Sequence, residues 1–364
     1  LMRFKMKILH VAEIVKGGVA SVMNQLIAGQ ENGNDLKIII PSNQLSEIQI
    51  NNKNNIIPFY SIKRSIYSHF NLLKTFIISV IKFKPDVIHI HSTFAGVICR
   101  LSLFLLPSRN IKIVYCPHAF SFMMDNHKYK KNIYILIERF LSRVTQKIIC
   151  VSDHEYNEAV THGFKKDKLV TIYNGVPDFG EPTRKKWLLN DKLNILFVGR
   201  FERQKGYDLL QEVIKHFSNR EDIYFHLVGD FVDNKDKTYI NTNNTVTYGW
   251  MPHEKVLDLY QNADLLIMPS RWEGLPMAAL EALNAGLPIL ASNCSAFPEL
   301  IKQNENGFLF ENENVDDIIN VILNILNDSD VLNKLTAMSN KCREIYLNKY
   351  DARIMINETY KLYN

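Results

Sequence analysis

The segment ADLLIMPSRWEGLPMAALE, residues 263–281, contains a strand, a loop and a helix in the order that parallel α/β sheets repeat. Its apolar start is typical of a buried strand, and Pro276 then opens a helix. A helix start after a strand offers free backbone N–H groups, which bind anions. Glu273 and Glu281 stand on either side of the loop with seven residues between them, and carboxylates accept hydrogen bonds from sugar or ribose hydroxyls. The segment therefore predicts a ligand with phosphate and hydroxyl groups together, such as a nucleotide sugar.

The length and composition of the chain indicate a globular protein of two domains. It has 364 residues, 46% hydrophobic and 22% charged, which is too long for one ordinary core. Its five cysteines are scattered and show no C-x-x-C spacing, as is typical of buried thiols in a reducing compartment. The first residues run directly into a strand rather than a signal peptide, and no apolar run is long enough for a membrane span. We therefore expect a cytoplasmic protein.

The positive charge of the chain is concentrated in its first half. Residues 1–180 hold 23 Lys and Arg against 12 Asp and Glu, although the whole chain has a net charge of only +5. Basic residues alternate with apolar ones in four segments: 59–64, 76–84, 100–109 and 122–143. Such a surface suits the anionic face of a membrane, and the alternative is that the lysines only solvate a core. We expect peripheral association with the inner face of the cytoplasmic membrane. No nucleic-acid partner is expected, because no binding motif accompanies the charge.

Short apolar runs alternate with helical patterns along both halves. Near-continuous apolar strands separated by helices predict a parallel sheet that is covered on both faces, which is a doubly wound α/β domain. The expected strands of the first half lie at 6–14, 36–41, 86–91, 111–117, 146–152 and 169–175. Those of the second half lie at 193–200, 223–230, 245–250, 263–269 and 287–292.

A polar segment with two prolines, residues 177–192, is the best candidate for the linker between the halves. We therefore predict an N-terminal Rossmann-like domain at 1–180 and a C-terminal one at 181–346. The final stretch, about 347–364, is an amphipathic helix that packs on another part of the chain. Two such domains place the carboxyl ends of both sheets around a shared cleft, where ligands of open α/β sheets bind.

Candidate phosphate-binding residues follow the first strand of each half. Arg200 and Lys205 come after the strand at 193–200, and two cations there suit a diphosphate and the charge that grows on it as it leaves. Gly17 and Gly18 follow the first strand of the chain, where glycines let a backbone amide approach a phosphate. The sequence around them is neither a dinucleotide fingerprint nor a Walker loop.

Three histidines of the first half lie on or after predicted strands, and we expect different roles for them. His118 follows the strand at 111–117 and could donate to a sugar hydroxyl or to a leaving oxygen, or be a hydrogen-bonded residue near the core. His89 and His91 alternate on a strand, so we expect them to be core residues. No histidine pattern indicates a metal, and no D-x-D pair appears where a manganese-dependent transferase would place one.

Two further strand ends carry candidate ligand contacts. Asn174 and Gly175 end the last strand of the first half and form a turn toward the linker, with ligand contact as a second possibility. Trp250 and Met251 follow another strand end, where an aromatic or backbone edge could contact a base. The alternative for Trp250 is a buried core position.

These motifs resemble those of the retaining glycosyltransferases of family 4, which have the GT-B fold of two Rossmann-like domains. The resemblance covers the whole chain and is most specific in the E-x7-E segment. It is carried by Gly17-Gly18, Asn174-Gly175-Val176, the run VGRFERQKG at 198–206, and Glu273 with Glu281.

The resemblance implies roles for the acidic residues and their neighbours. Glu281 would hold the ribose of the nucleotide. Glu273 would contact the transferred sugar, with help from the backbone amides of Gly274 and Leu275.

It also implies roles for the basic residues. Arg200 and Lys205 match a diphosphate-binding pair, and His118 matches a histidine near the donor sugar. Family members often have Asp after that histidine, where this chain has Ala119, so the role of this loop is open. The last helix, about 347–364, would cross back to the first domain, as it often does in GT-B proteins.

The resemblance implies a retaining transferase that needs neither a metal nor a cofactor. Its donor would be a nucleotide-diphosphate sugar, with UDP the expected nucleotide. Its acceptor would be a glycan or a polyprenyl-diphosphate-linked saccharide in surface-polysaccharide synthesis. One alternative is a nucleotide-sugar 2-epimerase of the same fold. The other is a non-catalytic GT-B subunit that binds a partner enzyme, although Glu273, Arg200 and Lys205 are all present.

Overall fold

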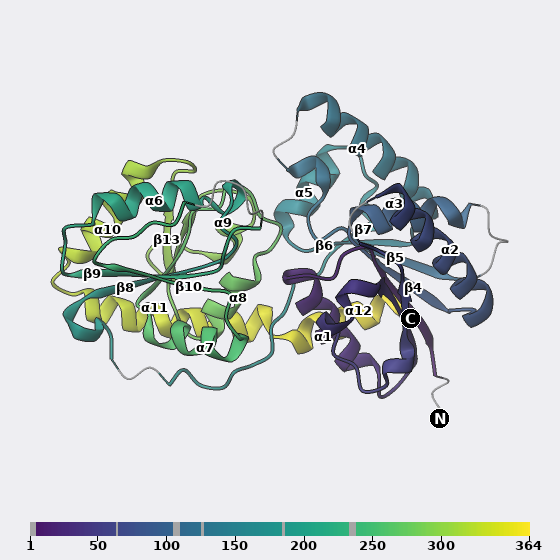
Figure 1. Ribbon diagram of the computed structural model, residues 1–364, viewed down its shortest axis with the longest axis horizontal. Helices are drawn as coiled ribbons and strands as arrows, with labels where there is room; N and C mark the ends of the chain where they lie inside the picture. The colour runs from purple at the N-terminus through teal and green to yellow at the C-terminus, as the bar shows by residue number, and fades with distance from the viewer. Residues whose placement is uncertain (1–4, 63–64, 105–109, 125–126, 184–185, 233–237) are drawn as a thin grey trace. The chain divides into compact units, whose positions relative to one another are not determined.

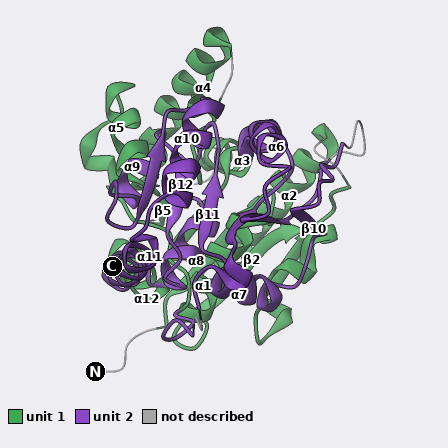
Figure 2. Cartoon of the chain, turned by 90° about the vertical axis from the view of Figure 1, so that its left-hand side faces the viewer, with its two compact units in different colours: residues 1–177, 352–364 green, residues 178–351 purple. Residues whose placement is uncertain are grey.

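The computed structural model describes the 364-residue chain except residues 1–4, 63–64, 105–109, 125–126, 184–185 and 233–237 (Figure 1). The chain forms two compact units, shown in two colours in Figure 2. Unit 1 consists of residues 1–177 and 352–364, and unit 2 of residues 178–351. The chain therefore passes from unit 1 to unit 2 between residues 177 and 178, against the boundary at 180 and 181 that we expected. It returns between residues 351 and 352.

Unit 1 is built on a seven-stranded sheet whose order is β3-β2-β1-β4-β5-β6-β7, with every described strand pair parallel. The strands are β1 Lys7–Ala12, β2 Asp35–Pro41, β3 Ile56–Phe59, β4 Val87–His91, β5 Lys112–Cys116, β6 Lys147–Cys150 and β7 Leu169–Thr171. Strand β3 was not expected from the sequence. It contains Pro58 and lies at the sheet edge, where proline is tolerated because one side of the strand needs no hydrogen bonds.

Helices cover both faces of this sheet (Figure 1). They are α1 Gly18–Gln30, α2 Ile66–Phe83, α3 Thr93–Leu103, α4 Lys128–Leu141, α5 Asp153–Thr161 and α12 Ala352–Tyr363. Short helical turns are η1 Ser42–Glu47, η2 Lys53–Asn55, η3 Ser121–Met123, η4 Ser142–Val144 and η5 Lys166–Lys168. One core cluster joins the sheet to α2 and α3 through apolar side chains such as Leu72, Phe76 and Cys99.

The C-terminal helix α12 belongs to unit 1. It packs on α1, where Gly29 leaves room for Ile356: a Cβ on Gly29 would lie 2.7 Å from Ile356 Cγ2. At its start, the N–H of Ala352 donates to the carbonyl of Val176 at 2.9 Å. The helix begins at Ala352, five residues later than the start at about 347 that we expected, because residues Tyr346–Tyr350 form a π-helical turn, η8, that ends the preceding helix.

Unit 2 contains a six-stranded parallel sheet in the order β10-β9-β8-β11-β12-β13. The strands are β8 Leu193–Val198, β9 Ile223–Val228, β10 Thr245–Gly249, β11 Leu265–Met268, β12 Ile289–Ser292 and β13 Gly307–Phe310. The helices are η6 Leu189–Asp191, η7 Arg203–Lys205, α6 Tyr207–His216, α7 His253–Asn262, α8 Met277–Asn284, α9 Phe297–Leu300, α10 Val315–Leu326 and α11 Val331–Ile345. The edge strand β13 was not expected either. Five of these six strands were, so the doubly wound prediction is confirmed.

Among the described residues, no helix has both the length and the apolar character needed to cross a membrane.

Candidate functional site

In unit 2, two hydrogen bonds join the loop that follows β8 to the loop that follows β11. The N–H of Arg271 donates to the carbonyl of Gln204 at 2.8 Å, and the side-chain amide of Gln204 donates to the carbonyl of Trp272 at 3.1 Å. These bonds join the run that contains Arg200 and Lys205 to the run that contains Glu273. The structure therefore brings the most specific predicted motifs together at the carboxyl end of the sheet.

A glycine permits this close approach. Gly206 has φ of +65°, and a Cβ at this position would lie 1.9 Å from the carbonyl oxygen of Pro269. Both the left-handed backbone and the lack of space require glycine here. The last residue of the motif VGRFERQKG thus has a steric role that its position in the sequence does not reveal.

Lys205 and Glu273 form an ion pair in this site. Lys205 Nζ lies 2.5 Å from Glu273 Oε1, and the side chains are 18% and 7% exposed. The backbone N–H of Glu273 also donates to the hydroxyl of Ser295 at 3.2 Å. An almost buried carboxylate needs such a partner, because burial without one is costly. The pair fixes one carboxylate oxygen, and the carboxylate keeps lone pairs that can accept further hydrogen bonds.

Arg200 is arranged differently from Lys205. Its Nη2 lies 2.8 Å from Glu202 Oε1 and 3.3 Å from Gln204 Oε1, and its side chain is 45% exposed. The guanidinium therefore lies at the surface of the loop, where it is open to an anionic group. The two cations that the sequence predicts belong to one loop, one paired with a nearly buried carboxylate and the other exposed.

Glu281 is held from two sides by residues that the sequence analysis did not single out. His253 Nε2 lies 2.9 Å from Glu281 Oε1, and the hydroxyl of Tyr260 donates to Glu281 Oε2 at 3.1 Å. The hydrogen bond to Glu281 raises the pKa of His253. Burial, together with the neighbouring carboxylate, raises the pKa of Tyr260 well above its usual range, so this hydroxyl keeps its proton and donates. Both partners lie on α7, which starts two residues after Met251.

A third residue that the sequence analysis did not single out, Arg271, stabilises the loop. Arg271 binds both carboxylate oxygens of Asp208, at 2.8 and 2.7 Å, and its Nε lies 2.8 Å from Glu313 Oε2. It also donates to the carbonyl of Arg203 at 2.7 Å. These bonds raise the pKa of Arg271 and keep it charged. A fork of parallel N–H groups gives this contact a fixed geometry, so Arg271 holds the loop rather than a ligand.

The remaining predicted residues of unit 2 lie around this loop. Gly274 and Leu275 are buried and lead into α8, which has no side-chain hydrogen bond at its N-cap, Pro276. Trp250 is 63% exposed after the end of β10, so the buried alternative for this residue is wrong. Met251 is partly buried beside it.

In unit 1, His118 lies on a turn with unusual backbone geometry at the end of β5. His118 has φ of 58° and Ala119 has φ of 114°, both in the range that side chains disfavour. The carboxylate of Glu155 accepts hydrogen bonds from the N–H of Phe120 at 2.9 Å and of Val151 at 2.7 Å, and also from the N–H of Ala119. The fully buried Glu155 therefore holds this turn, which does not need the Asp that family members often have after the histidine.

The other predicted residues of unit 1 lie at strand ends. Gly17, with φ of 55°, precedes α1, and this helix start has no side-chain hydrogen bond and no acidic residue in its first turn. Asn174 is buried, and the N–H of Gly175 contacts Met355 Sδ at 3.3 Å, so this segment holds the start of α12. His89 and His91 are buried, as expected of core residues.

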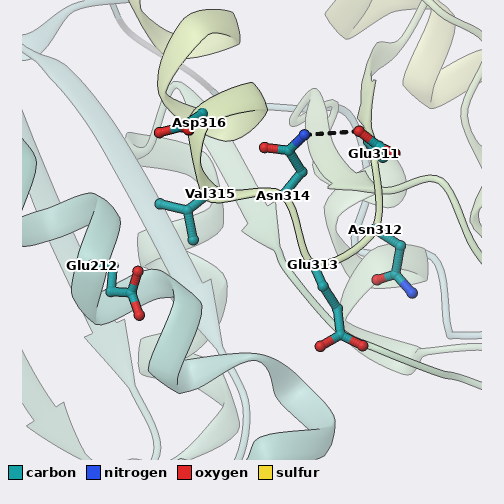
Figure 3. Close-up of a pocket in the computed structure, with 7 residues that line it drawn as sticks. All are labelled: Glu212, Glu311, Asn312, Glu313, Asn314, Val315 and Asp316. Atoms are coloured by element: carbon teal, nitrogen blue, oxygen red, sulfur yellow. Dashed lines mark hydrogen bonds between the residues drawn. The ribbon is translucent and has the colours of Figure 1, made fainter.

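Two further acidic features contain none of the residues predicted for the site. A pocket of unit 2 is lined by Glu212 from α6 and by residues 311–316 (Figure 3). Its carboxylates would repel a diphosphate, and Glu313 is already paired with Arg271. Asp328 and Asp330 form a D-x-D pair between α10 and α11, and Asp328 binds Lys334 at the surface.

Comparison with known proteins places these features in a family. The family model described as "Glycosyltransferase Family 4" matches residues 15–178, and the model described as "Glycosyl transferases group 1" matches residues 180–344. The chain belongs to the family 4 glycosyltransferases, with the GT-B fold of two Rossmann-like units, so the family and fold that the sequence resembles are confirmed.

Two bacterial proteins are among the relatives of this chain. An "Uncharacterized 41.2 kDa protein in cps region" of Klebsiella pneumoniae is 37% identical over 98% of this chain and 99% of its own length. The Escherichia coli "UDP-Gal:alpha-D-GlcNAc-diphosphoundecaprenol alpha-1,3-galactosyltransferase" is 28% identical over 82% of this chain and 79% of its own. These relatives support a glycosyltransferase over the epimerase alternative.

Solved structures share the fold at low identity. Sucrose-phosphate synthase from Thermosynechococcus elongatus has a TM-score of 0.80 at 16% identity, covering 99% of this chain and 98% of its own. Anabaena HepE in complex with UDP-glucose has a TM-score of 0.76 at 15% identity, covering 98% of both chains.

Proposed function

We propose that the enzyme transfers a sugar from a UDP-sugar to a polyprenyl-diphosphate-linked saccharide during surface-polysaccharide synthesis, with retention of configuration and without a metal. The observation that carries this proposal is the Lys205–Glu273 ion pair, in which Lys205 shares a loop with the exposed Arg200 and Glu273 precedes α8, the helix that carries Glu281. The names of the Klebsiella and E. coli relatives support the polysaccharide context and the lipid-linked acceptor.

The basic residues of this loop take the place of a metal in the proposed reaction. Arg200 and Lys205 bind the diphosphate and stabilise the negative charge that develops as it leaves. Glu273, oriented by Lys205, accepts hydrogen bonds from hydroxyls of the transferred sugar, and Glu281 accepts them from the ribose. The acceptor hydroxyl attacks the anomeric carbon on the face that the diphosphate leaves and gives its proton to an oxygen of the departing diphosphate, so no protein nucleophile is needed.

The first experiment incubates the protein with UDP-galactose, UDP-glucose, UDP-N-acetylglucosamine, GDP-mannose and ADP-glucose, with and without N-acetylglucosaminyl-diphosphoundecaprenol. Nucleotide release measures turnover, and the anomeric proton of the product reports retention or inversion. Chelation of divalent metals tests metal independence. We expect release from one UDP-sugar that requires the acceptor and persists with the chelator.

Glu273→Gln is the informative variant, because it keeps the shape of the side chain and removes its charge. Glu254→Gln, an exposed residue on α7, is the matched control and should leave turnover unchanged. Release that survives Glu273→Gln undiminished, or a product of inverted configuration, would contradict the proposed mechanism. Acceptor-independent formation of an epimer would show an isomerase instead.

We also propose that one face of unit 1 docks on an anionic membrane. Helices α2, α3 and α4 lie side by side on this unit. They expose large apolar side chains, and Phe104 stacks on Phe140 with ring centroids 5.3 Å apart. The exposed apolar residues include Ile66, Tyr67, Phe70, Tyr129, Leu136 and Phe140.

The charge of α4 fits an anionic surface. It carries Lys128, Lys130 and Lys131 beside the exposed Tyr129, while its acidic residue Glu138 is buried and bound to Arg100 at 2.7 Å. The carboxylate of Glu138 is therefore buried, whereas the lysines of α4 remain at the surface, where they can contact anionic lipids. Other parts of the expected basic surface, residues 63–64, 105–109 and 125–126, lie outside the described residues.

Vesicle flotation tests this docking. Vesicles that contain phosphatidylglycerol should carry the protein upward, and vesicles of phosphatidylcholine alone should not. Tyr129→Ser with Leu136→Ser should abolish flotation, while Leu332→Ser, at a comparably exposed position on α11 of unit 2, should not. Equal binding to both vesicle types, or full binding by the double variant, would refute this docking surface.

A further inference from the structure

A chain of hydrogen bonds runs through the interior of unit 1 and ends at His118. Gln30 Oε1 lies 2.7 Å from His10 Nε2, and His10 Nδ1 lies 3.1 Å from His91 Nε2. His91 Nδ1 then lies 3.0 Å from His118 Nε2. Gln30, His10 and His91 are fully buried, whereas His118 is partly exposed. The family resemblance places His118 near the donor sugar, and the proposed function gives the other three residues no role.

The register of strands β1 and β4 brings the hydrogen-bonded histidines together. His10 on β1 pairs with His89 on β4, and His91 lies two residues further along the same face. Gln30 is the last residue of α1, which covers this face. The rings of His91 and His118 stack with centroids 5.3 Å apart. The positions of the three histidines are therefore set by strand pairing and by the turn that Glu155 holds.

The three histidines of this hydrogen-bond chain, His10, His91 and His118, are neutral. Burial lowers the pKa of His10 and of His118 to about 4, and burial together with the neighbouring histidines lowers the pKa of His91 well below its usual range. A neutral imidazole carries one N–H, so one ring nitrogen donates and the other accepts. The tautomer of each ring is therefore decided by its hydrogen-bond partners.

Gln30 determines which partner donates in each hydrogen bond between Gln30 and His118. Its Oε1 only accepts, so His10 must carry its proton on Nε2, which leaves Nδ1 bare. His91 must then donate from Nε2 to that nitrogen, and its own Nδ1 accepts from Nε2 of His118. The Gln30 amide is oriented by its other end, because Nε2 donates to the hydroxyl of Tyr363 at 3.4 Å.

We propose that Gln30, His10 and His91 are positioning residues that fix the tautomer of His118, so that its Nδ1 presents a bare lone pair to a hydroxyl of the sugar substrate. Among the described residues, the structure gives His118 Nδ1 no hydrogen-bond partner. This inference rests on the proposed function for the identity of the substrate. It assigns His118 the role of an acceptor, where the sequence suggested a donor, and it selects sugars that have a hydroxyl at that position over their deoxy analogues.

Two histidines of the hydrogen-bond chain, together with His89, could instead form a metal site. His10, His89 and His91 offer ring nitrogens within 4.8 Å of one another. Both nitrogens of His10 and of His91 already take part in the hydrogen-bond chain, and the rings of His89 and His91 stack at 4.2 Å. Metal ligands in a histidine site each give an in-plane lone pair to one point, which stacked rings with committed nitrogens do not offer. His89 instead bonds Tyr363 through Nδ1 at 2.6 Å, as a side branch.

Nuclear magnetic resonance of the full-length protein with isotope-labelled histidine tests the tautomers directly, because the ring-nitrogen shifts show which nitrogen carries the proton. We expect the proton on Nε2 of His10, His91 and His118. In Gln30→Met, which has similar length and no acceptor oxygen, His118 should show a mixture of tautomers. Gln30→Glu restores an acceptor and should restore the single tautomer.

Tyr360→Phe is the matched control, because it removes a hydroxyl of α12 that bonds Asn34 and leaves both Gln30 and Tyr363 in place. It should keep the tautomer of His118. A proton on Nδ1 of His118 in the natural protein, or a His118 tautomer that Gln30→Met does not change, would overturn the proposal. Stoichiometric binding of added Zn²⁺ that shifts the resonances of His10 and His91 would overturn it in favour of a metal site.

Kinetics with UDP-galactose and UDP-glucose connect the tautomer to the reaction. Gln30→Met should lower kcat/KM roughly tenfold, the effect of one hydrogen bond, and Gln30→Glu should recover most of it. Thermal melts check that each variant is folded. An altered tautomer with unchanged kcat/KM would refute the link to substrate. If the natural protein transfers no sugar, the proposed function fails, while the resonance data still decide the tautomer.

Discussion

At the scale of single residues, Lys205 and Arg200 differ in what their removal should do. Lys205→Met leaves the nearly buried carboxylate of Glu273 without its ion partner. We expect the free energy of unfolding to fall by about 2 kcal/mol, and kcat to fall roughly 100-fold with little change in KM. Denaturant unfolding and donor-saturation kinetics measure the two effects.

Arg200→Met is the comparison for this prediction. Arg200 is an exposed partner of Glu202, so its removal should leave stability nearly unchanged while still lowering kcat. Equal loss of kcat and of donor affinity in both variants would show that the cations serve ground-state binding only.

The sequence predicted the charged residues of the site better than it predicted their supports. Glu273, Glu281 and Lys205 follow strands within a specific motif, and their place in the fold follows from that. Tyr260 and Glu155 carry no comparable signal, because tyrosine and glutamate are common in helical sequences, and only the packing of each helix shows that the side chain is buried and what it holds.

At the scale of elements, the approach of two loops depends on Gly206. Gly206→Ala would place a Cβ 1.9 Å from the carbonyl oxygen of Pro269 and force a left-handed alanine. We expect a loss of about 2 kcal/mol or more in unfolding free energy. Turnover should also fall, because the loop that carries Lys205 is pushed away from Glu273. Unfolding curves and donor kinetics measure both.

Gly249→Ala separates the steric effect from the backbone effect. Gly249 also has a positive φ, of 69°, but nothing lies within 4 Å of a Cβ built there. This variant should lose only about 1 kcal/mol for the left-handed conformation. A Gly206→Ala variant no less stable than Gly249→Ala would show that the two loops can separate at little cost.

Long apolar strands were predicted, and two of the four edge strands, β3 and β13, were not. The runs around β1, β4 and β8 are buried on both faces, which gives a continuous apolar signal. Strands β3 and β13 have four residues each, and they lie at the edges of their sheets. An edge strand of this length is determined by its single neighbour, so its own sequence carries little information.

At the scale of the whole molecule, the two units should respond differently to acid. In unit 1, burial lowers the pKa of His10, His89, His91 and His118 below the ordinary value of 6.5. The unfolded chain therefore binds more protons than the folded one as pH falls from 6.5 toward 4, and unit 1 loses stability. Glu155, whose burial raises its pKa to about 7, acts in the opposite direction, but it is one group against four.

Unit 2 carries one histidine of each kind: burial lowers the pKa of His226 to about 4, and His253 is shifted in the opposite direction. The pKa of His253 is raised by Glu281, so its contribution is fully present below pH 6.5 and is lost as pH rises through its folded value. All three tryptophans, Trp187, Trp250 and Trp272, belong to unit 2. On acidification, circular dichroism should therefore report partial unfolding before tryptophan fluorescence changes. Simultaneous transitions at every pH would contradict separate responses of the units.

Because α12 belongs to unit 1, the ribosome completes the sequences of the two units in a fixed order. Unit 2 is one continuous stretch, residues 178–351, while unit 1 needs residues 352–364 as well. The ribosome therefore releases every residue of the second unit before it releases the helix that completes the first. During translation the unit that starts later is the first whose sequence is complete. Until α12 emerges, the face of the first sheet that carries His10, His89 and His91 lacks its contact with Tyr363 and is partly exposed.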